Sequence, residues 1–126
     1  MHSNIIEMVL LRGIFMERTN ENEKTFRKGD SGPKYLFRGP KFEWGILVLK
    51  PGEKMGCHGH NEVEETFYFL EGTPKMIVDD VPYEVKVGDA FRIEPLEKHD
   101  IYNDTDSNVK FVFIKCPYLP DDKIAY

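Results

Sequence analysis

Between residues 35 and 115 the chain consists of short runs of β-branched and aromatic residues separated by turn-forming residues. Pairs such as Pro51-Gly52 and Gly88-Asp89 supply the fixed or positive φ angles that tight connections between antiparallel strands need. No sustained helical period interrupts this pattern, so it predicts an all-β sandwich or barrel. The expected strands are 35–38, 42–50, 56–60, 65–71, 75–79, 83–87, 90–93, 99–103 and 109–115.

A chain of 126 residues with 40% hydrophobic residues is long enough for one domain with its own core. We expect a barrel domain over 35–126, preceded by an N-terminal extension and arm over 1–34. The polar residues 17–34, with Gly29 and Gly32, predict a loop or a weakly ordered arm. The apolar segment 5–16 is compatible with a helix that starts near Ser3, an edge strand that pairs with a second subunit, or an extension of little structural weight.

The composition indicates in which cellular compartment the protein occurs and which classes of partner it does not bind. Cys57 and Cys116 lie far apart and form no metal-binding or disulfide spacing, which favours a reducing cytoplasm. The apolar segment near the N-terminus is interrupted by charges and too short to cross a bilayer, so neither a membrane span nor a signal peptide is expected. The net charge of -5 is concentrated after residue 50, which argues against nucleic-acid binding.

Three of the four histidines occur beside turns in two stretches of the expected barrel. His58 and His60 are two residues apart, so on an extended strand both rings project from the same face. Glu65 opens the next strand and could complete a ligand set with them. Imidazole together with carboxylate suits Mn, Fe, Co, Ni, Cu or Zn.

The spacing of these residues resembles a motif of the cupin family. In the first cupin motif a glycine, five residues, a His-x-His pair, three or four residues, a glutamate, six residues and a glycine follow in order. Gly52, His58, His60, Glu65 and Gly72 match every one of these spacings. The agreement of several positions is far more specific than an isolated His-x-His pair.

The second cupin motif is matched in part. Gly88, His99 and Asn103 hold the expected places, whereas Glu94 stands where the family has a proline and Leu96 stands where it has a glycine. These two departures concern the turn that precedes His99, where Pro95 could supply similar rigidity one residue later.

The resemblance implies a double-stranded β-helix, or jelly-roll, barrel that binds one divalent transition-metal ion per chain. It implies His58, His60, Glu65 and His99 as the metal ligands, with Mn or Fe favoured over Zn, Ni, Co or Cu. Small cupins are commonly dimers, so we expect a homodimer. Residues 109–114, which are apolar on both faces, would suit such a contact.

Some neighbouring residues allow two interpretations. Either Glu64 or Glu65 could face inward, and the six-residue spacing to Gly72 favours Glu65. Arg92 could offer a guanidinium to an anionic substrate, although a solvated position is the simpler expectation. The apolar residues of the strands are expected to form the core before they line any pocket; these are Phe67, Phe69, Phe91, Ile93, Ile101, Phe111 and Phe113.

Four protein ligands on an ion that prefers six leave two positions for water, substrate or O2. We therefore expect a metal-dependent enzyme for a small oxygen-rich molecule, with dioxygenase, decarboxylase or isomerase chemistry and with Glu65 as a catalytic proton acceptor. The alternative is a non-catalytic module that binds or senses a sugar, a metal or an organic acid in the same pocket.

Overall fold

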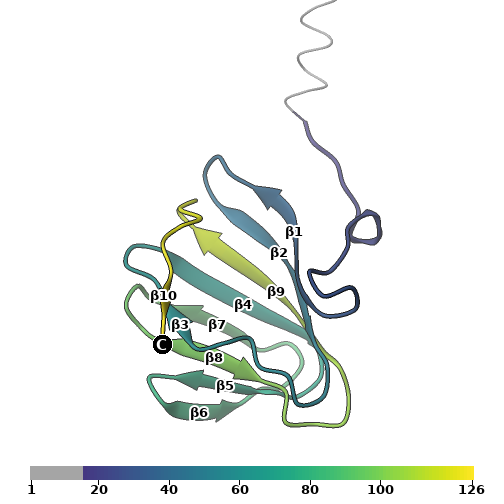
Figure 1. Cartoon of the computed structure of the whole chain (residues 1–126), viewed down its shortest axis with the longest axis vertical. Coiled ribbons are helices and arrows are strands. Elements are labelled where there is room, and N and C mark those ends of the chain that lie inside the picture. Colours follow the sequence, from purple (N-terminus) through teal and green to yellow (C-terminus); the bar gives the residue numbers. More distant parts are fainter. Residues whose placement is uncertain (1–15) are drawn as a thin grey trace, which may run out of the picture.

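The computed structural model describes residues 16–126, which form two antiparallel sheets of five strands each (Figure 1). The first sheet has the order β1 (Gly32–Arg38), β2 (Glu43–Leu49), β9 (Val109–Cys116), β4 (Glu64–Glu71) and β7 (Ala90–Ile93). The second has the order β10 (Ile124–Ala125), β3 (His58–Gly59), β8 (His99–Tyr102), β5 (Lys75–Val78) and β6 (Val81–Glu84). A single 3-10 turn, Glu21–Glu23, is the only helical element among these residues. The all-β prediction is therefore confirmed.

The core lies between the inner faces of the two sheets. Along β4 the buried Glu65, Phe67 and Phe69 alternate with outward residues, which is the two-residue period of a half-buried strand. Phe111 on β9 packs against both aromatic rings, with centroids 5.7 Å from Phe67 and 5.1 Å from Phe69. The second sheet contributes Met76 and Ile101 to the same cluster. The apolar residues expected in the core are all found there, with Phe91 partly buried at its edge.

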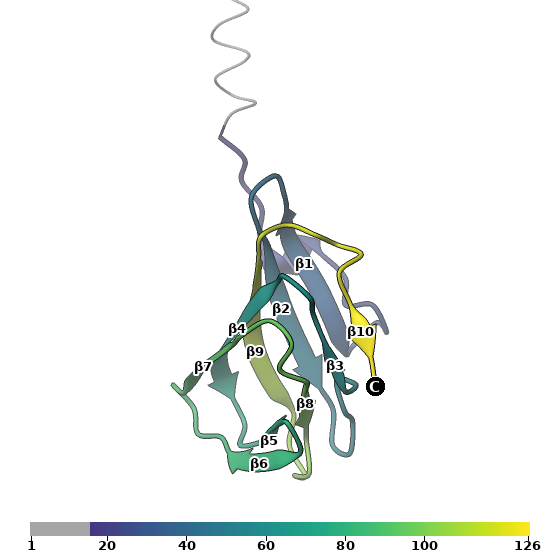
Figure 2. The ribbon, with the colours of Figure 1, turned by 90° about the vertical axis from the view of Figure 1, so that its left-hand side faces the viewer.

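Several strand limits differ from those predicted. β1 begins at Gly32 and not at residue 35, because an edge strand tolerates Pro33 without losing a ladder hydrogen bond. β6 covers Val81–Glu84 and not 83–87, and it too is an edge strand that contains a proline. β10 was not anticipated, because its two residues have no periodicity and pair only with the distant β3. Figure 2 shows β10 beside β3.

Residues that precede β1 are tied to the outer face of the first sheet (Figure 1). The carboxylate of Glu21 forms ion pairs with Lys34 at 3.5 Å and with Lys110 at 2.9 Å. The ammonium of Lys34 also lies 4.1 Å from the centroid of the Phe26 ring. The part of the arm from residue 21 onward thus contacts the barrel. Most of the apolar segment 5–16 lies outside the described part of the chain, which begins at residue 16.

Two further expectations concern surfaces. Val112 and Ile114, on the outer face of β9, are only partly buried within one chain, and the homodimer stays a prediction. Within residues 16–126 no helix has the length and apolar character needed to cross a membrane.

Close packing of β1 against β2 depends on Gly45. A Cβ at this position would collide with the backbone carbonyl of Lys34 and would lie 2.8 Å from the Cα of Tyr35, next to an irregularity in the strand register. Backbone atoms cannot move aside as the tip of a side chain can. We predict that Gly45→Ala lowers the free energy of unfolding by about 1 to 3 kcal/mol, measured by urea denaturation of the metal-free protein.

Gly59→Ala is the matched control for this prediction. A Cβ at Gly59 would first meet the ring of Tyr126 at 3.3 Å, which is a side chain that can shift. The loss of stability should therefore be clearly smaller than at Gly45. Equal losses for the two variants would show that backbone contact at Gly45 is not the constraint.

Candidate metal centre

The two sheets bring four chemically matched side chains to one point. His58 on β3 and His99 on β8 are directly paired across the second sheet, and His60 follows two residues after His58. Glu65 comes from β4 in the first sheet. All four side chains are buried, and one ligand atom from each lies within 4.8 Å of the others. The structure therefore brings together the complete set of residues that the sequence predicted.

Backbone carbonyl groups determine which nitrogen of each histidine faces inward. The Nδ1 atom of His58 lies 2.7 Å from the carbonyl oxygen of Gly56, and that of His99 lies 3.0 Å from the carbonyl oxygen of Glu97. His60 makes the same contact with the carbonyl of Asp122. A carbonyl oxygen can only accept, so each Nδ1 must donate its hydrogen. In the neutral rings the Nε2 atoms therefore carry lone pairs and no hydrogen.

These three Nε2 atoms converge on one oxygen of Glu65. The distances to Oε1 are 3.3 Å from His58, 3.0 Å from His60 and 3.0 Å from His99. Four acceptor atoms at such distances repel one another unless positive charge lies among them, whether as protons or as a metal ion. Two ligand atoms at about 2.1 Å from an ion and at right angles to each other lie about 3.0 Å apart. The cluster thus suits a metal ion by its donor set, its burial and its spacing.

In the metal-free protein, protons supply the positive charge. Burial alone raises the pKa of the Glu65 carboxyl, but hydrogen bonds from His58, His60 and His99 outweigh it and lower this pKa well below its ordinary value. For His60 the directions are reversed. Burial lowers the pKa of its imidazole, but the contacts with Glu65 and with the carbonyl of Asp122 outweigh burial and raise this pKa above its ordinary value. Both shifts favour a protonated imidazole beside an ionised carboxylate.

The segment before β10 holds the loop that carries His60. Besides its carbonyl contact with His60, Asp122 accepts hydrogen bonds through its carboxylate from the backbone N–H groups of Asn61, Glu62 and Val63, at 2.8, 2.8 and 3.0 Å. The hydrogen bond from Glu62 is the main reason that the pKa of Asp122 is lowered. Sequence reasoning missed Asp122, because nothing local connects it with a histidine 62 positions away.

The turn before His99 has a left-handed residue at the position of the expected glycine. Leu96 occupies the place where the family has glycine, and it adopts a positive φ of 71°. Its N–H donates to the carbonyl of His60 at 2.7 Å, so this turn also supports the ligand loop. Asn103 is fully buried, and its side-chain amide donates to the carbonyls of Leu49 and Ser107. Asn103 therefore anchors the loop that follows β8.

The structure decides between Glu64 and Glu65 as the inward carboxylate, and it shows where Arg92 lies. Glu65 is 2% exposed and faces the histidines, whereas Glu64 points outward and forms an ion pair with Arg92 at 3.9 Å. Arg92 is exposed and is not among the residues that line the cavity beside the cluster. The hypothesis that Arg92 binds a substrate is therefore wrong for this cavity, because residue alternation along β7 turns its side chain to the outer face.

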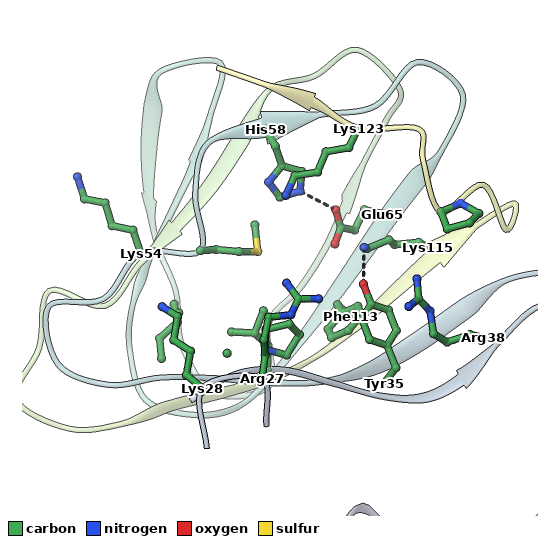
Figure 3. A pocket seen from close by; sticks show the side chains of 16 residues that line it. Arg27, Lys28, Tyr35, Arg38, Lys54, His58, Glu65, Phe113, Lys115 and Lys123 are labelled. Atoms are coloured by element: carbon green, nitrogen blue, oxygen red, sulfur yellow. Dashed lines mark hydrogen bonds and ion pairs between the residues drawn. The ribbon is translucent and has the colours of Figure 1, made fainter. Parts of the chain in front are cut away.

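A row of charged residues crosses the inner face of the first sheet beside the cluster. The register places Lys115 between Glu43 on β2 and Glu65 on β4. Its ammonium donates to the hydroxyl of Tyr35 at 2.9 Å (Figure 3). It also lies 3.6 Å from the carboxylate of Glu43. Burial lowers the pKa of Lys115, but the neighbouring Glu65 carboxylate and Tyr35 raise it overall, so the group stays an ammonium. Lys115 follows Phe111 and Phe113 at two-residue intervals along β9, so its inward position could have been predicted from the sequence.

A cavity of about 290 Å³ adjoins the cluster, with His58, Glu65 and Lys115 in its wall (Figure 3). Apolar side chains form much of the remaining wall, among them Leu47, Met55 and Phe113. The candidate metal centre is thus reached from a concave, partly apolar space of the size used for small ligands.

The role of Asp122 can be tested by its effect on metal affinity. Asp122→Ala keeps the carbonyl that faces His60 but removes the three hydrogen bonds to the loop, so we expect an affinity for Zn²⁺ or Mn²⁺ lower by about tenfold or more in a chelator-competition titration. Asp122→Asn, which retains an acceptor oxygen, should lose less. Asp121→Ala, at the exposed neighbouring position, is the control and should bind as the unchanged protein does. Unchanged affinity in Asp122→Ala would refute the positioning role.

Comparison with known proteins places this geometry in a family. The model of the Cupin domain family (Cupin_2) matches residues 45–115. The uncharacterized protein MJ1618 of Methanocaldococcus jannaschii is 34% identical over 85 residues, which are 68% of this chain and 66% of that protein. Protein SchB of Streptomyces halstedii is 32% identical over 82 residues, which are 65% of this chain and 59% of that protein. The matched region spans less than two thirds of the length of either relative.

Solved structures share the same arrangement of strands. A conserved protein with a double-stranded β-helix domain from Klebsiella pneumoniae superimposes with a TM-score of 0.76 at 15% identity, over 87% of this chain and 96% of that one. At this identity the likeness concerns the fold, and it confirms the predicted double-stranded β-helix. With a family match that covers more than half of its residues, the chain belongs to the Cupin_2 family of cupin-domain proteins.

Proposed function

We propose that this protein is a metal-dependent enzyme that acts on a small oxygen-rich molecule. The observation that carries the proposal is the buried group of three imidazole nitrogens and one carboxylate oxygen, all acceptors, in the wall of a cavity. A purely structural site would be closed by its ligands, whereas this one adjoins a space for a further molecule. Mn or Fe is the favoured ion, at one per chain, because imidazole and carboxylate suit it and it accepts additional ligands.

The residues around the site have separate roles in this proposal. His58, His60, Glu65 and His99 would hold the ion, which when bound supplies Lewis-acid polarisation of a substrate oxygen. The apolar wall limits the access of water to the bound substrate. Glu65, as a carboxylate, serves as a proton acceptor, and the ammonium of Lys115 with the hydroxyl of Tyr35 supplies hydrogen-bond donors beside it. Dioxygenase, decarboxylase and isomerase reactions all use such components.

Metal content is the first test of this function. We expect the purified protein to contain about one Mn or Fe per chain by elemental analysis. His60→Ala and Glu65→Gln should each lose most of this metal and retain the fold by circular dichroism, because the apolar core does not depend on them. Glu64→Gln, which changes the outward-facing neighbour, is the matched control. Stoichiometric metal in His60→Ala would count against the proposed ligands.

Activity separates an enzyme from a sensor. The metal-loaded protein should consume O2 or release CO2 with a member of a panel of small diols, hydroxy acids and keto acids, or should isomerise one of them. Glu65→Gln should abolish the reaction, and Glu64→Gln should not. Tight binding of a panel member without turnover would contradict the enzyme hypothesis and support the non-catalytic binding module.

The pKa shifts predict how the metal changes stability with pH. Without metal, the raised pKa of His60 stabilises the folded protein below the unfolded value of about 6.5 and loses effect as pH rises through the folded value. The lowered pKa of Glu65 stabilises it above about 4.5 and loses effect as pH falls through its folded value. The metal-free protein should thus gain most from this cluster between about pH 4.5 and 6.5.

Metal binding has the opposite dependence, because it needs neutral imidazoles. Saturating Mn²⁺ should therefore raise the melting temperature by several degrees at pH 8 and by much less at pH 5.5, as measured by scanning calorimetry. His60→Ala should show little rise at either pH. A rise at pH 5.5 as large as that at pH 8 would contradict binding through the histidines.

A further inference from the structure

The cavity beside the candidate metal centre is lined by cationic side chains from separate parts of the chain. Arg27 and Lys28 precede β1, Arg38 ends β1, Lys115 lies on β9 and Lys123 precedes β10. Figure 3 shows Arg27, Lys115 and Lys123 directed into the space in front of His58 and Glu65. A sixth cation in the wall, Lys54, points away from that space and packs over the ring of Tyr102 at 4.9 Å. Five cationic residues besides Lys54 therefore line the cavity, and three of them are directed into it.

Acidic groups neutralise only part of this charge. Glu43 is shared by Arg38 and Lys115, at 3.0 Å and 3.6 Å. Glu53 lies 3.7 Å from Lys28. Arg27 and Lys123 form no ion pair with any residue in the range 16–126. Glu65 is the one acidic residue of the described chain that lines the cavity, and its carboxylate is engaged by the three histidines.

This positive opening belongs to an acidic protein. The chain has 22 acidic residues against 17 Lys and Arg, so the cations at the cavity do not reflect an overall basic surface. The apolar wall near them, which includes Leu47, Leu49 and Phe113, holds the local dielectric low and concentrates the field. A bound divalent ion would add to the same field. A neutral sugar would make little use of such charge, whereas an anion would be drawn in and held.

We propose that the cavity binds a small organic dianion. One carboxylate of this ligand occupies the space in front of His58 and Glu65, within reach of Lys115. The second oxyanion group, a carboxylate or a phosphate, lies at the opening between Arg27 and Lys123. The cavity volume of about 290 Å³ limits the ligand to a few carbon atoms between the two charges. The inference rests on the proposed function, because it names the substrate class of the same site.

The test is a comparison of three ligands of nearly equal shape and different charge. Succinate carries two negative charges, succinamate one and succinamide none, and their binding to the Mn-loaded and to the metal-free protein is measured by isothermal titration calorimetry at low ionic strength. We expect affinity to fall in that order in both forms, with succinate bound at least tenfold more tightly than succinamide. 2-Phosphoglycolate, whose phosphate brings a further negative charge, shows whether the opening accepts a phosphate in place of the second carboxylate.

Charge-removing variants locate the second oxyanion group. Arg27→Gln and Lys123→Gln should each weaken succinate binding by about tenfold and leave succinamide unaffected, since a charge-assisted hydrogen bond is lost. Both side chains are exposed, so the fold should be retained. Lys24→Gln, an exposed lysine outside the cavity, is the matched control and should bind succinate unchanged.

The outcomes separate this inference from the proposed function. Equal affinity for succinate and succinamide, or unchanged succinate binding in both Arg27→Gln and Lys123→Gln, would overturn the dianion site even if the protein holds its metal. If the protein binds no metal but still prefers succinate through these two residues, the dianion site stands and the metal-dependent enzyme does not.

Discussion

Three hydrogen bonds from histidine Nδ1 atoms to backbone carbonyls govern the chemistry of this barrel. Because the carbonyls of Gly56, Glu97 and Asp122 can only accept, each ring donates from Nδ1 and turns its Nε2 toward Glu65, and this Nε2 carries no hydrogen while the ring is neutral. The result is a buried group of potential acceptors whose mutual repulsion is relieved by positive charge among them. Protons on the imidazoles can supply that charge, and the donor set also suits a metal ion, so both states of the site follow from the orientation of three rings.

The division between the two sheets explains how such a site can be both rigid and open. The second sheet and the loop after β3 provide the imidazoles, and the first sheet provides Glu65 together with Lys115. Each sheet is held by its own ladder, so the ligands do not rely on one another for their positions. The cavity lies on the side of the cluster where Tyr35, Phe113 and Lys115 form the wall. In the proposed binding of a dianion, positive charge around its opening would make it selective by charge as well as by size.

Short apolar and aromatic runs between turn residues predicted the all-β class, and the spacing of His58, His60 and Glu65 suggested that they could share an ion. The resemblance to the cupin motifs added the double-stranded β-helix and His99 as the fourth ligand. Both signals are local, or depend on a motif with fixed spacing. The support that β10 and Asp122 give to the ligand loop could not be predicted, because these contacts form only between segments far apart in the sequence. The cations at the cavity were missed for the same reason, since Arg27, Lys115 and Lys123 share no segment.

The hydrogen bonds between Asp122 and the loop that carries His60 join residues about 60 positions apart, and Asp122 and His60 themselves are 62 positions apart. Contacts between such distant residues form only after much of the intervening chain has been ordered, because closing a long loop loses entropy that other contacts must first offset. We therefore expect the complete ligand set to assemble late during folding. A partly folded chain would hold an ion weakly, so occupancy by metal would mark molecules whose barrel is already finished.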